Sequence, residues 1–400
     1  MPEPLPGPEA VKEGSSMKFF HLSDLHIGRQ LHQYSLLEDQ RHILQEVLTY
    51  VEALRPDGIV IAGDIYDKPV PSAEAVALFD EFLTSLAGKG SPMAIMVISG
   101  NHDSGRRLDY AGRILERQNI YIAGSLPSCR GERLKRVTLA DEFGEVDFYL
   151  LPFLKPGYVR GVLQDAEPGS YTEAVSRMIQ RENIDFSKRN VLLSHQFYMG
   201  GRQEPQTCDS ERFSVGGIDN VDIGSIKDFD YAALGHLHGA QQVAVPHIRY
   251  CGTLLKYSVS EAEHIKSLHV IELGPKHKEI SVQELPLHPL RDVRKIKGEL
   301  KNILKEAKAA NREDYVSITL TDEMAPYKPK EQLEKVYSHI LEIRIDNTRT
   351  RRRLEEFRDE PGADDPLEIF DDFFQEIQGR LISKEEREFM RKIMEKAERE

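Results

Sequence analysis

Short apolar runs that end in polar residues recur between residue 17 and about residue 240. The run MKFFHL (17–22) leads into SDLHIG, and the pattern returns in DGIVIAGD (57–64), MAIMVISGNHD (93–103), NVLLSHQ (190–196) and DYAALGHLHG (230–239). Their length and composition predict strands, and each run finishes in Asp, Asn or His. Segments 38–54 and 72–88 carry apolar residues at helical spacing. Strands that alternate with helices predict an α/β sheet domain over 17–275, with ligands at the carboxyl ends of its strands.

A different pattern begins near residue 286. VRKIKGEL, DYVSITLTDE and LEIRIDN predict strands, and KNILKEAKAA and EQLEKVYSHI predict the helices between them. These elements indicate a small α+β domain over 286–348. The remaining residues, 349–400, are strongly charged and contain two helical patterns.

Both helical patterns of the tail have helix-start signals and an apolar stripe. Asp365 followed by Pro366 is a favourable start for a helix. Ser383 with Glu386 forms a capping-box pattern at the start of the second helix. The stripes consist of Leu367, Phe370, Phe374 and Ile377 in 364–380, and of Phe389, Met390 and Ile393 in 383–400. Exposed apolar stripes usually meet a partner, although the two helices can also fold back on their own domain.

Composition indicates a globular protein of two or three domains, because 40% of its 400 residues are hydrophobic and 30% are charged. No apolar stretch approaches the roughly 18–20 residues that cross a bilayer. Residues 1–16 lack the apolar region of a secretory signal, so we expect a disordered leader there. Cys129, Cys208 and Cys251 form no CxxC pair. This disfavours disulfides and a thiolate zinc site, and it favours the reducing cytoplasm.

The formal net charge of −13 disfavours a polyanionic partner at first sight. Phosphates are contacted mainly by Lys and Arg. Bound divalent cations would reverse the balance locally, at the place where a phosphate reacts. The acidity is therefore weak evidence against a nucleic-acid substrate.

Asp24 and His26 follow the first predicted strand, and both side chains can bind metal. The later strand ends add side chains of the same kinds, namely Asp64, Asn101, His102, His195, His236 and His238. An oxygen and nitrogen set without sulfur suits Mn²⁺, Fe²⁺ or Zn²⁺. Two such ions about 3.5–4 Å apart can clamp the attacking and leaving oxygens of a phosphoryl transfer. Asp64 is the natural carboxylate to bridge them.

Each motif alone is weak, because a lone His near a strand end is usually a hydrogen-bonded core residue and Asn, Asp and Gly are ordinary turn residues. The joint pattern is specific. Five motifs occur in order after apolar runs, and glycine precedes the key residue in three of them. The other nine histidines, among them His21, His32 and His247, belong to no motif, and we expect ordinary structural roles for them.

The order DxH, GDxxD, GNHD, H and GHxH resembles the signature of the calcineurin-like metallophosphoesterases. YAALGHLHGAQQV and RYCGTLLKYS extend the resemblance to the bacterial SbcD family of nuclease subunits, over about residues 17–380. The resemblance implies an α/β fold, a β-sandwich flanked by helices, with 286–348 as a capping domain and 349–400 as a helical partner-binding tail. It also implies two divalent ions per subunit, Mn²⁺ above all. One would be held by Asp24, His26, Asp64 and His238, and the other by Asp64, Asn101, His195 and His236.

The resemblance also implies roles beside the metals. His102 would contact the scissile phosphate and protonate the leaving oxygen, and Asp103 would orient its ring. Asp67 stands where some relatives have a substrate-contacting His, so it is a further candidate substrate contact whose role stays open. Leu25 stands where many relatives have Trp, at a position that is not a ligand.

The implied activity is that of a Mn²⁺-dependent nuclease in DNA repair. It would be a 3′-to-5′ exonuclease on double-stranded ends and an endonuclease on single strands and hairpins, without base specificity. The family works as a homodimer with SbcC, an ATPase with a long coiled coil. The chain contains no G-x-x-x-x-G-K-[ST] loop, so ATP dependence has to come from that partner. The tail would dock on SbcC, and segments 38–54 and 72–88 would join the two subunits unless both pack only on their own sheet.

Two other functions stay open at this point. A phosphatase or small-molecule phosphodiesterase of the same superfamily would share the metal centre but would need neither a cap nor a partner-binding tail. A non-catalytic scaffold would be expected to have lost metal ligands, yet all seven ligand positions are filled here. Comparing the turnover of a small chromogenic phosphodiester with that of duplex DNA separates the first alternative from the nuclease.

Overall fold

The fold is described from a computed structural model of the chain. The described residues are 16–88, 93–163, 168–200, 205–211, 219–307, 312–324, 326–349, 367, 370–371, 374 and 380–397. They form two compact units, one with the described parts of 1–296, 307–318 and 333–342, and one with those of 297–306, 319–332 and 343–400. The predicted leader, except Ser16, and most of the predicted helix 364–380 lie outside the described residues. The domain boundaries inferred from the sequence stay predictions.

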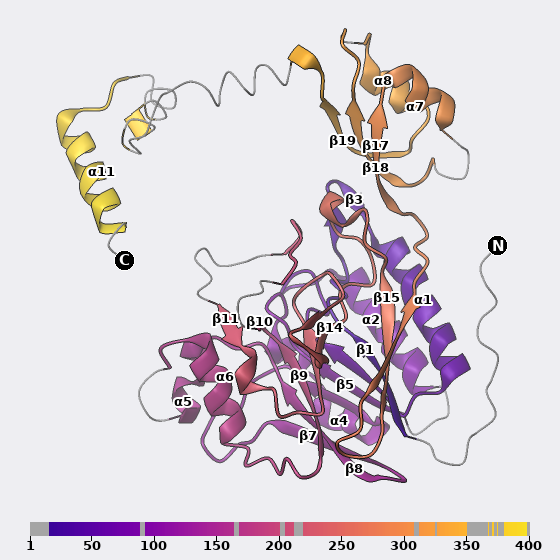
Figure 1. Cartoon of the computed structure of the whole chain (residues 1–400), viewed down its shortest axis with the longest axis vertical. Coiled ribbons are helices and arrows are strands. Elements are labelled where there is room, and N and C mark those ends of the chain that lie inside the picture. Colours follow the sequence, from indigo (N-terminus) through magenta and orange to yellow (C-terminus); the bar gives the residue numbers. More distant parts are fainter. Residues whose placement is uncertain are drawn as a thin grey trace. The chain divides into compact units, whose positions relative to one another are not determined.

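The first unit contains a sandwich of two six-stranded sheets with helices on both outer faces (Figure 1). One sheet has the order β16 (Ser281–Pro286), β15 (Ser267–Leu273), β1 (Met17–Leu22), β4 (Gly58–Ala62), β5 (Ala94–Ile98) and β6 (Ile120–Ala123). The other has the order β13 (Gln241–Val243), β14 (Val245–Tyr250), β12 (Tyr231–Gly235), β9 (Arg189–His195), β8 (Gly144–Leu151) and β7 (Lys135–Asp141). The predicted α/β sandwich is therefore confirmed.

The central strands are buried on both faces, which explains why they read as continuous apolar runs. Side chains of a strand alternate between its faces. In β1, Phe20 and Leu22 belong to the core cluster shared with the helices, whereas Met17 and Phe19 belong to the cluster between the two sheets. The layer between the two sheets is thus apolar, and it packs the two sheets against each other.

Helices cover the outer faces of the two sheets (Figure 1). On the first sheet lie α1 (Leu37–Leu54) and α2 (Ala73–Ala87), as 38–54 and 72–88 predicted. On the second lie α5 (Arg160–Leu163) and α6 (Tyr171–Gln180). The hydroxyl of Ser72 caps α2, and that of Ser170 caps α6. No helix in the described part of the chain is long and apolar enough to span a membrane.

Strand direction brings the polar strand ends together. In the first sheet, β1, β4 and β5 are parallel neighbours. In the second, β9 and β12 are parallel neighbours. Each group therefore presents its carboxyl ends at one edge, where the five motifs begin.

Shorter elements fill the connections of the first unit. They are β2 (Gln30–Leu31), β3 (Tyr34–Ser35), α3 (Gly105–Leu108), α4 (Gly112–Leu115), β10 (Phe197–Met199), β11 (Asn220–Asp222) and the 3₁₀ helices η1 (Glu116–Gln118), η2 (Pro156–Val159), η3 (Ile223–Ser225) and η4 (Val259–Glu261). The three cysteines are free thiols. Cys129 is exposed, and Cys208 and Cys251 are buried.

A separate three-stranded sheet has the order β17 (Val293–Gly298), β18 (Tyr315–Leu320) and β19 (His339–Ile345), with α7 (Leu300–Glu306) and α8 (Pro329–Leu333) in its connections. The three strands were predicted, but the predicted helix over EQLEKVYSHI was wrong beyond its first residues. The alternating segment HILEIRI has the period of a strand, and Leu341 is buried in the core. Packing of that strand outweighs the helical propensity of the residues before it.

The last described helix is α11 (Lys384–Ala397). Its predicted capping box is confirmed, because the backbone N–H of Glu386 donates to the Ser383 hydroxyl at 3.3 Å and the Ser383 N–H donates to the Glu386 carboxylate at 2.9 Å. The side chain of Phe389 on this helix is 66% exposed.

Candidate metal centre

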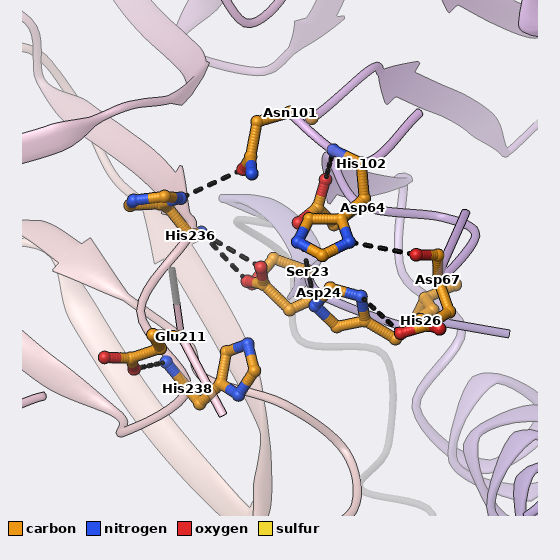
Figure 2. Close-up of polar contacts among 12 residues, drawn as sticks. Ser23, Asp24, His26, Asp64, Asp67, Asn101, His102, Glu211, His236 and His238 are labelled. Carbon is orange, nitrogen blue, oxygen red and sulfur yellow. Dashed lines mark hydrogen bonds and ion pairs between the residues drawn. The ribbon is translucent and has the colours of Figure 1, made fainter. Parts of the chain in front are cut away.

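The loops after β1 and β4 are joined by backbone hydrogen bonds, which place the first two motifs side by side. The N–H of Asp24 donates to the carbonyl of Gly63 at 3.0 Å, and the N–H of His26 donates to the carbonyl of Asp64 at 2.9 Å. Figure 2 shows the side chains of Asp24, His26 and Asp64 turned toward a common space. The backbone pairing of the two loops therefore brings the first two motifs together at this edge of the sheet.

Four side chains of the cluster sit on left-handed backbone. Asp24, His26 and Asp64 have φ of 52°, 42° and 51°, and His236 has φ of 109°. Such conformations cost non-glycine residues on the order of 1–3 kcal/mol each and persist only where the surroundings enforce them. Here the enforcing contacts are the loop pairing and the two bonds from the His236 N–H to the Asp24 carboxylate, at 3.0 and 3.1 Å.

The glycines that precede three key residues are required for close packing. A Cβ on Gly63 would collide with the ring of His195, and one on Gly100 would collide with the carboxylate of Asp64. A Cβ on Gly235 would collide with the carbonyl of Ala62. Glycine is therefore the residue that lets these strand ends approach one another, within the first sheet at Gly100 and between the two sheets at Gly63 and Gly235.

Asn101 joins the two histidines of the second sheet. Its Oδ1 lies 3.1 Å from His195 Nε2 and 3.1 Å from His236 Nδ1. Burial, followed by the neighbouring His195, lowers the pKa of His236 to about 3, so this ring is neutral. An amide oxygen and two ring nitrogens thus converge at one point, as ligands of a cation do.

The ring of His195 is fixed by its backbone contact. Its Nδ1 lies 2.7 Å from the carbonyl of Ala62 and must donate there, so Nε2 faces the cluster. Nε2 lies 3.4 Å from Asp64 and 3.9 Å from Asp24. Burial alone would lower the pKa of His195, but the carboxylates of Asp64 and Asp24 outweigh burial and raise it to about 9. These two buried carboxylates therefore favour positive charge at this point.

His26 gives the clearest sign of a ligand role. The ring is buried, and within the described residues neither of its nitrogens has a hydrogen-bond partner. Burial lowers its pKa far below the usual range, so the ring is neutral and offers a lone pair. Its Nε2 lies 3.6 Å from Asp64. Unpaired buried polar atoms are costly, and a metal ion at this place would satisfy the ring.

The donor atoms form overlapping groups of a size that suits metal ions. Those of Asp24, His26 and His238 lie within 4.8 Å of one another, and so do those of Asp24, Asp64 and His195. A third group of the same size consists of His26, Asp64 and His102. With the contacts of Asn101 to His195 and His236, these groups bring the seven predicted ligands together, and their oxygen and nitrogen atoms are of the kinds that bind divalent cations.

The sequence did not predict the residues that support His238. Its Nδ1 lies 2.7 Å from the hydroxyl of Ser210, which donates to Glu261 at 2.6 Å. Glu261 is fully buried and forms an ion pair of 2.6 Å with Lys266. Lys266 also donates to the carbonyl of His238 at 2.9 Å. This network orients the imidazole from outside the cluster, as carboxylates do for metal-binding histidines.

The carboxylate of Asp103 has partners that differ from the implied one. The carboxylate of Asp103 accepts the N–H groups of Gly100, Ile65 and Tyr66 at 2.9–3.0 Å, so it joins the second and third motifs. The ring of His102 is instead held through its Nδ1, 2.9 Å from the carbonyl of Asp67. The expectation that Asp103 orients this ring is corrected accordingly.

The carboxylate of Asp67 is also engaged. It pairs with Arg29 at 3.0 Å and lies 3.9 Å from the ring of His26. Its contact with a substrate therefore stays a prediction. Outside the motifs, His21 is a buried core histidine, as expected, bonded to the hydroxyl of Tyr231 and the carbonyl of Leu234 at 2.9 and 3.2 Å.

The family model of the calcineurin-like phosphoesterases matches residues 17–240, which contain all five motifs. The chain therefore belongs to the calcineurin-like phosphoesterase family. Residues 289–378 match a second model, described as the type 5 capsule protein repressor C-terminal domain.

Relatives over most of the chain narrow this assignment. The chain is 33% identical to the SbcD subunit of the SbcCD nuclease of Staphylococcus epidermidis, over 82% of this chain and 85% of that protein. It is 30% identical to the corresponding SbcCD nuclease subunit of Staphylococcus saprophyticus, over 94% of this chain and 98% of that protein. The resemblance to the SbcD family inferred from the motifs is thus confirmed.

Two solved structures are similar at lower identity. One is the phosphopantetheinyl hydrolase PptH of Mycobacterium tuberculosis, with a TM-score of 0.32 and 14% identity over 59% of this chain and 88% of that chain. The other is a dimetal phosphatase of Danio rerio, with a TM-score of 0.38 and 12% identity over 68% of this chain and 96% of that chain.

Proposed function

We propose that the chain is the nuclease subunit of an SbcC–SbcD-type complex and hydrolyses DNA phosphodiester bonds with two bound Mn²⁺ ions. The observation that carries this proposal is the group of buried aspartates and histidines at the strand ends, together with the half-buried Asn101, in a chain whose relatives are named as nuclease subunits over most of their length. It would act from 3′ to 5′ on duplex ends and internally on single strands.

The ligands divide into two sets that share one carboxylate. Asp24, His26, Asp64 and His238 would hold one ion, and Asp64, Asn101, His195 and His236 the other. Bound divalent ions supply charge neutralisation of the scissile phosphate and a nucleophile near neutral pH. The histidine-rich set favours Mn²⁺ over Mg²⁺.

His102 would move the proton that the leaving oxygen needs. Its Nδ1 faces the carbonyl of Asp67, which can only accept, so Nδ1 carries a hydrogen. Nε2 is then the atom that exchanges a proton with the substrate. His102 is partly exposed, unlike the buried rings of His26 and His195, so a leaving oxygen can reach it.

The experiment that tests the proposal compares substrates under the same conditions. Purified protein with Mn²⁺, Mg²⁺ or Zn²⁺ is incubated with 3′- or 5′-labelled duplex, circular single-stranded DNA and a small chromogenic phosphodiester. We expect cleavage of both DNA substrates, best with Mn²⁺, and none with chelator. Turnover of the small diester without cleavage of either DNA would favour the phosphatase or small-molecule phosphodiesterase instead.

A homodimer that binds SbcC is the assembly that we propose. Val70, just before α2, and Val76, on α2, are 66% and 45% exposed, and a second copy of the chain can cover them. Phe389 on α11 and Leu381 just before it are 66% and 74% exposed and suit the coiled coil of SbcC. In light scattering at tens of micromolar, the chain should have twice its mass of 45.6 kDa.

Truncation after Asn347 separates the two contacts. The shortened protein should keep the dimer and Mn²⁺-dependent cleavage of single strands, and it should lose co-purification with SbcC and ATP-stimulated activity. A monomeric full-length chain would contradict the dimer, and unchanged affinity of the truncated chain for SbcC would contradict the role of the tail.

A further inference from the structure

The loop that carries His26 has strained backbone and needs contacts from outside the loop. His26 and Gly28 have φ of 42° and 90°, and left-handed backbone at a residue other than glycine persists only where its surroundings enforce it. Pairing with the loop after β4 uses the N–H groups of Asp24, His26 and Ile27. The carbonyl of Leu25 and the N–H of Gly28 are left to other partners, because peptide groups inside a protein are nearly always bonded.

Gln40, on α1, bonds to this loop from the inner face of the helix. Its Oε1 accepts the N–H of Gly28 at 2.9 Å, and its Nε2 donates to the carbonyl of His26 at 2.8 Å. The same Nε2 lies 3.4 Å from the carbonyl of Leu25. Gln40 is buried, and burying an amide is costly unless its polar atoms are bonded. These bonds therefore stabilise the amide and at the same time tie α1 to the loop of the first motif.

Tyr257 holds the same loop from the other side of the amide. Its hydroxyl donates to the carbonyl of Leu25 and lies 3.2 Å from Nε2 of Gln40, whose second hydrogen it accepts. Burial raises the pKa of Tyr257 above its usual value, so the hydroxyl keeps the hydrogen that it donates. The ring stands edge-on to that of His26, with centroids 5.6 Å apart. Gln40 and Tyr257 thus bind the carbonyls of the peptide groups before and after the His26 side chain.

The ring of His26 needs this support because it lacks the contact that orients other metal-binding histidines. Such a ring is normally oriented by a hydrogen bond at its second nitrogen. The ring of His195 has a backbone carbonyl as this partner, and that of His238 has a serine hydroxyl. Within the described residues, neither nitrogen of His26 has a hydrogen-bond partner, and the carboxylate of Asp67 is 3.9 Å away. The direction of this ring is therefore set by its backbone and by the side chains packed against it.

We propose that Gln40 and Tyr257 are positioning residues for the metal ion that His26 holds. They act through the backbone of the first motif, which fixes the direction of the lone pair on the ring. The inference rests on the proposed function and deepens it, because it names residues outside the five motifs on which one of the two ions depends. In the described part of the chain, neither side chain is bonded to Asn101, His195 or His236. The ion held by that other set should therefore depend on them far less.

The test measures the affinity of each Mn²⁺ ion for the full-length protein, by equilibrium binding and by electron paramagnetic resonance, which distinguishes a coupled ion pair from a single ion. Gln40→Met keeps the length of the side chain but leaves the N–H of Gly28 without its partner. It should weaken one of the two ions by about 10- to 100-fold, the usual effect of losing such an outer contact. Tyr257→Phe keeps the ring and should weaken the same ion by about tenfold. In both variants the signal of the ion pair should disappear at low Mn²⁺ and return at high Mn²⁺.

Gln180→Met is the matched control, since Gln180 is exposed at the end of α6 on the other sheet, and both affinities should stay unchanged. Thermal melting in chelator shows which variants are folded, and Tyr257→Phe decides the question if Gln40→Met is not. If folded variants bind both ions as the wild type does, or lose both equally, the inference is overturned and the proposed function stands. Selective loss of one ion in a protein that cleaves no DNA would support the inference and overturn the proposed function. A wild type that binds no Mn²⁺ would overturn both.

Discussion

Asp64→Asn should reduce DNA cleavage by about 10³-fold or more, together with loss of the metal pair. Asp64 lies beside His26 and His195 and is the one carboxylate common to both proposed ligand sets. An amide keeps the shape and still accepts the N–H of His102, which donates to Asp64 at 2.8 Å. It removes the negative charge that bridges two cations. A metal ion contributes several kcal/mol to such reactions, and each 1.36 kcal/mol is about tenfold in rate.

The measurement combines initial rates on labelled duplex with the number of Mn²⁺ ions bound per chain at equilibrium. The matched control is Asp228→Asn, which alters an exposed aspartate and should change neither quantity. Thermal melting of both variants in chelator checks that the fold survives. An Asp64→Asn protein that still binds two ions and cleaves at the wild-type rate would rule out Asp64 as the bridge.

His102→Ala should lower DNA turnover by about 10²–10⁴-fold, the usual contribution of a positioned acid or base, while both metal ions stay bound. The ring is held by the carbonyl of Asp67 and is partly exposed, which suits proton transfer. His102 also lies close enough to His26 and Asp64 to share an ion with them, so the metal count is the decisive companion measurement.

The leaving group distinguishes acid catalysis from a structural role. A phenolate such as p-nitrophenolate leaves without a proton, so His102→Ala should affect the chromogenic diester far less than DNA. His247→Ala serves as control, since His247 belongs to no motif and its Nε2 contacts the carbonyl of Lys227. Equal losses on both substrates, or loss of both ions in His102→Ala, would show that the ring does not act as the acid.

The strand ends of the site could be predicted because their signal is local. Apolar runs set the strands, and polar residues directly after them have to lie at the sheet edge. The glycines before Asp64, Asn101 and His236 were noticed as part of the motifs. Only the structure explains why glycine is needed at these positions. A side chain there would collide with a carbonyl, a carboxylate or a ring that comes from another strand or strand end.

The supporting contacts could not be predicted, because they join distant parts of the chain or use backbone atoms. Ser210, Glu261 and Lys266 lie far from His238 in the sequence, and nothing in their local sequence marks them. The partner of the His102 ring is a carbonyl of Asp67, a group that every residue has. The helix expected over EQLEKVYSHI failed for a related reason, since burial of Leu341 in a distant core decided the outcome.

The two-metal mechanism is tested most directly by the rate of DNA cleavage as a function of the number of Mn²⁺ ions bound per chain. Metal-free protein is titrated with Mn²⁺, and bound metal and cleavage of labelled duplex are measured on the same samples. We expect saturation at two ions per chain, cleavage that rises with occupancy of both sites, and complete loss in chelator. Saturation at one ion, or full cleavage by the metal-free protein, would contradict it.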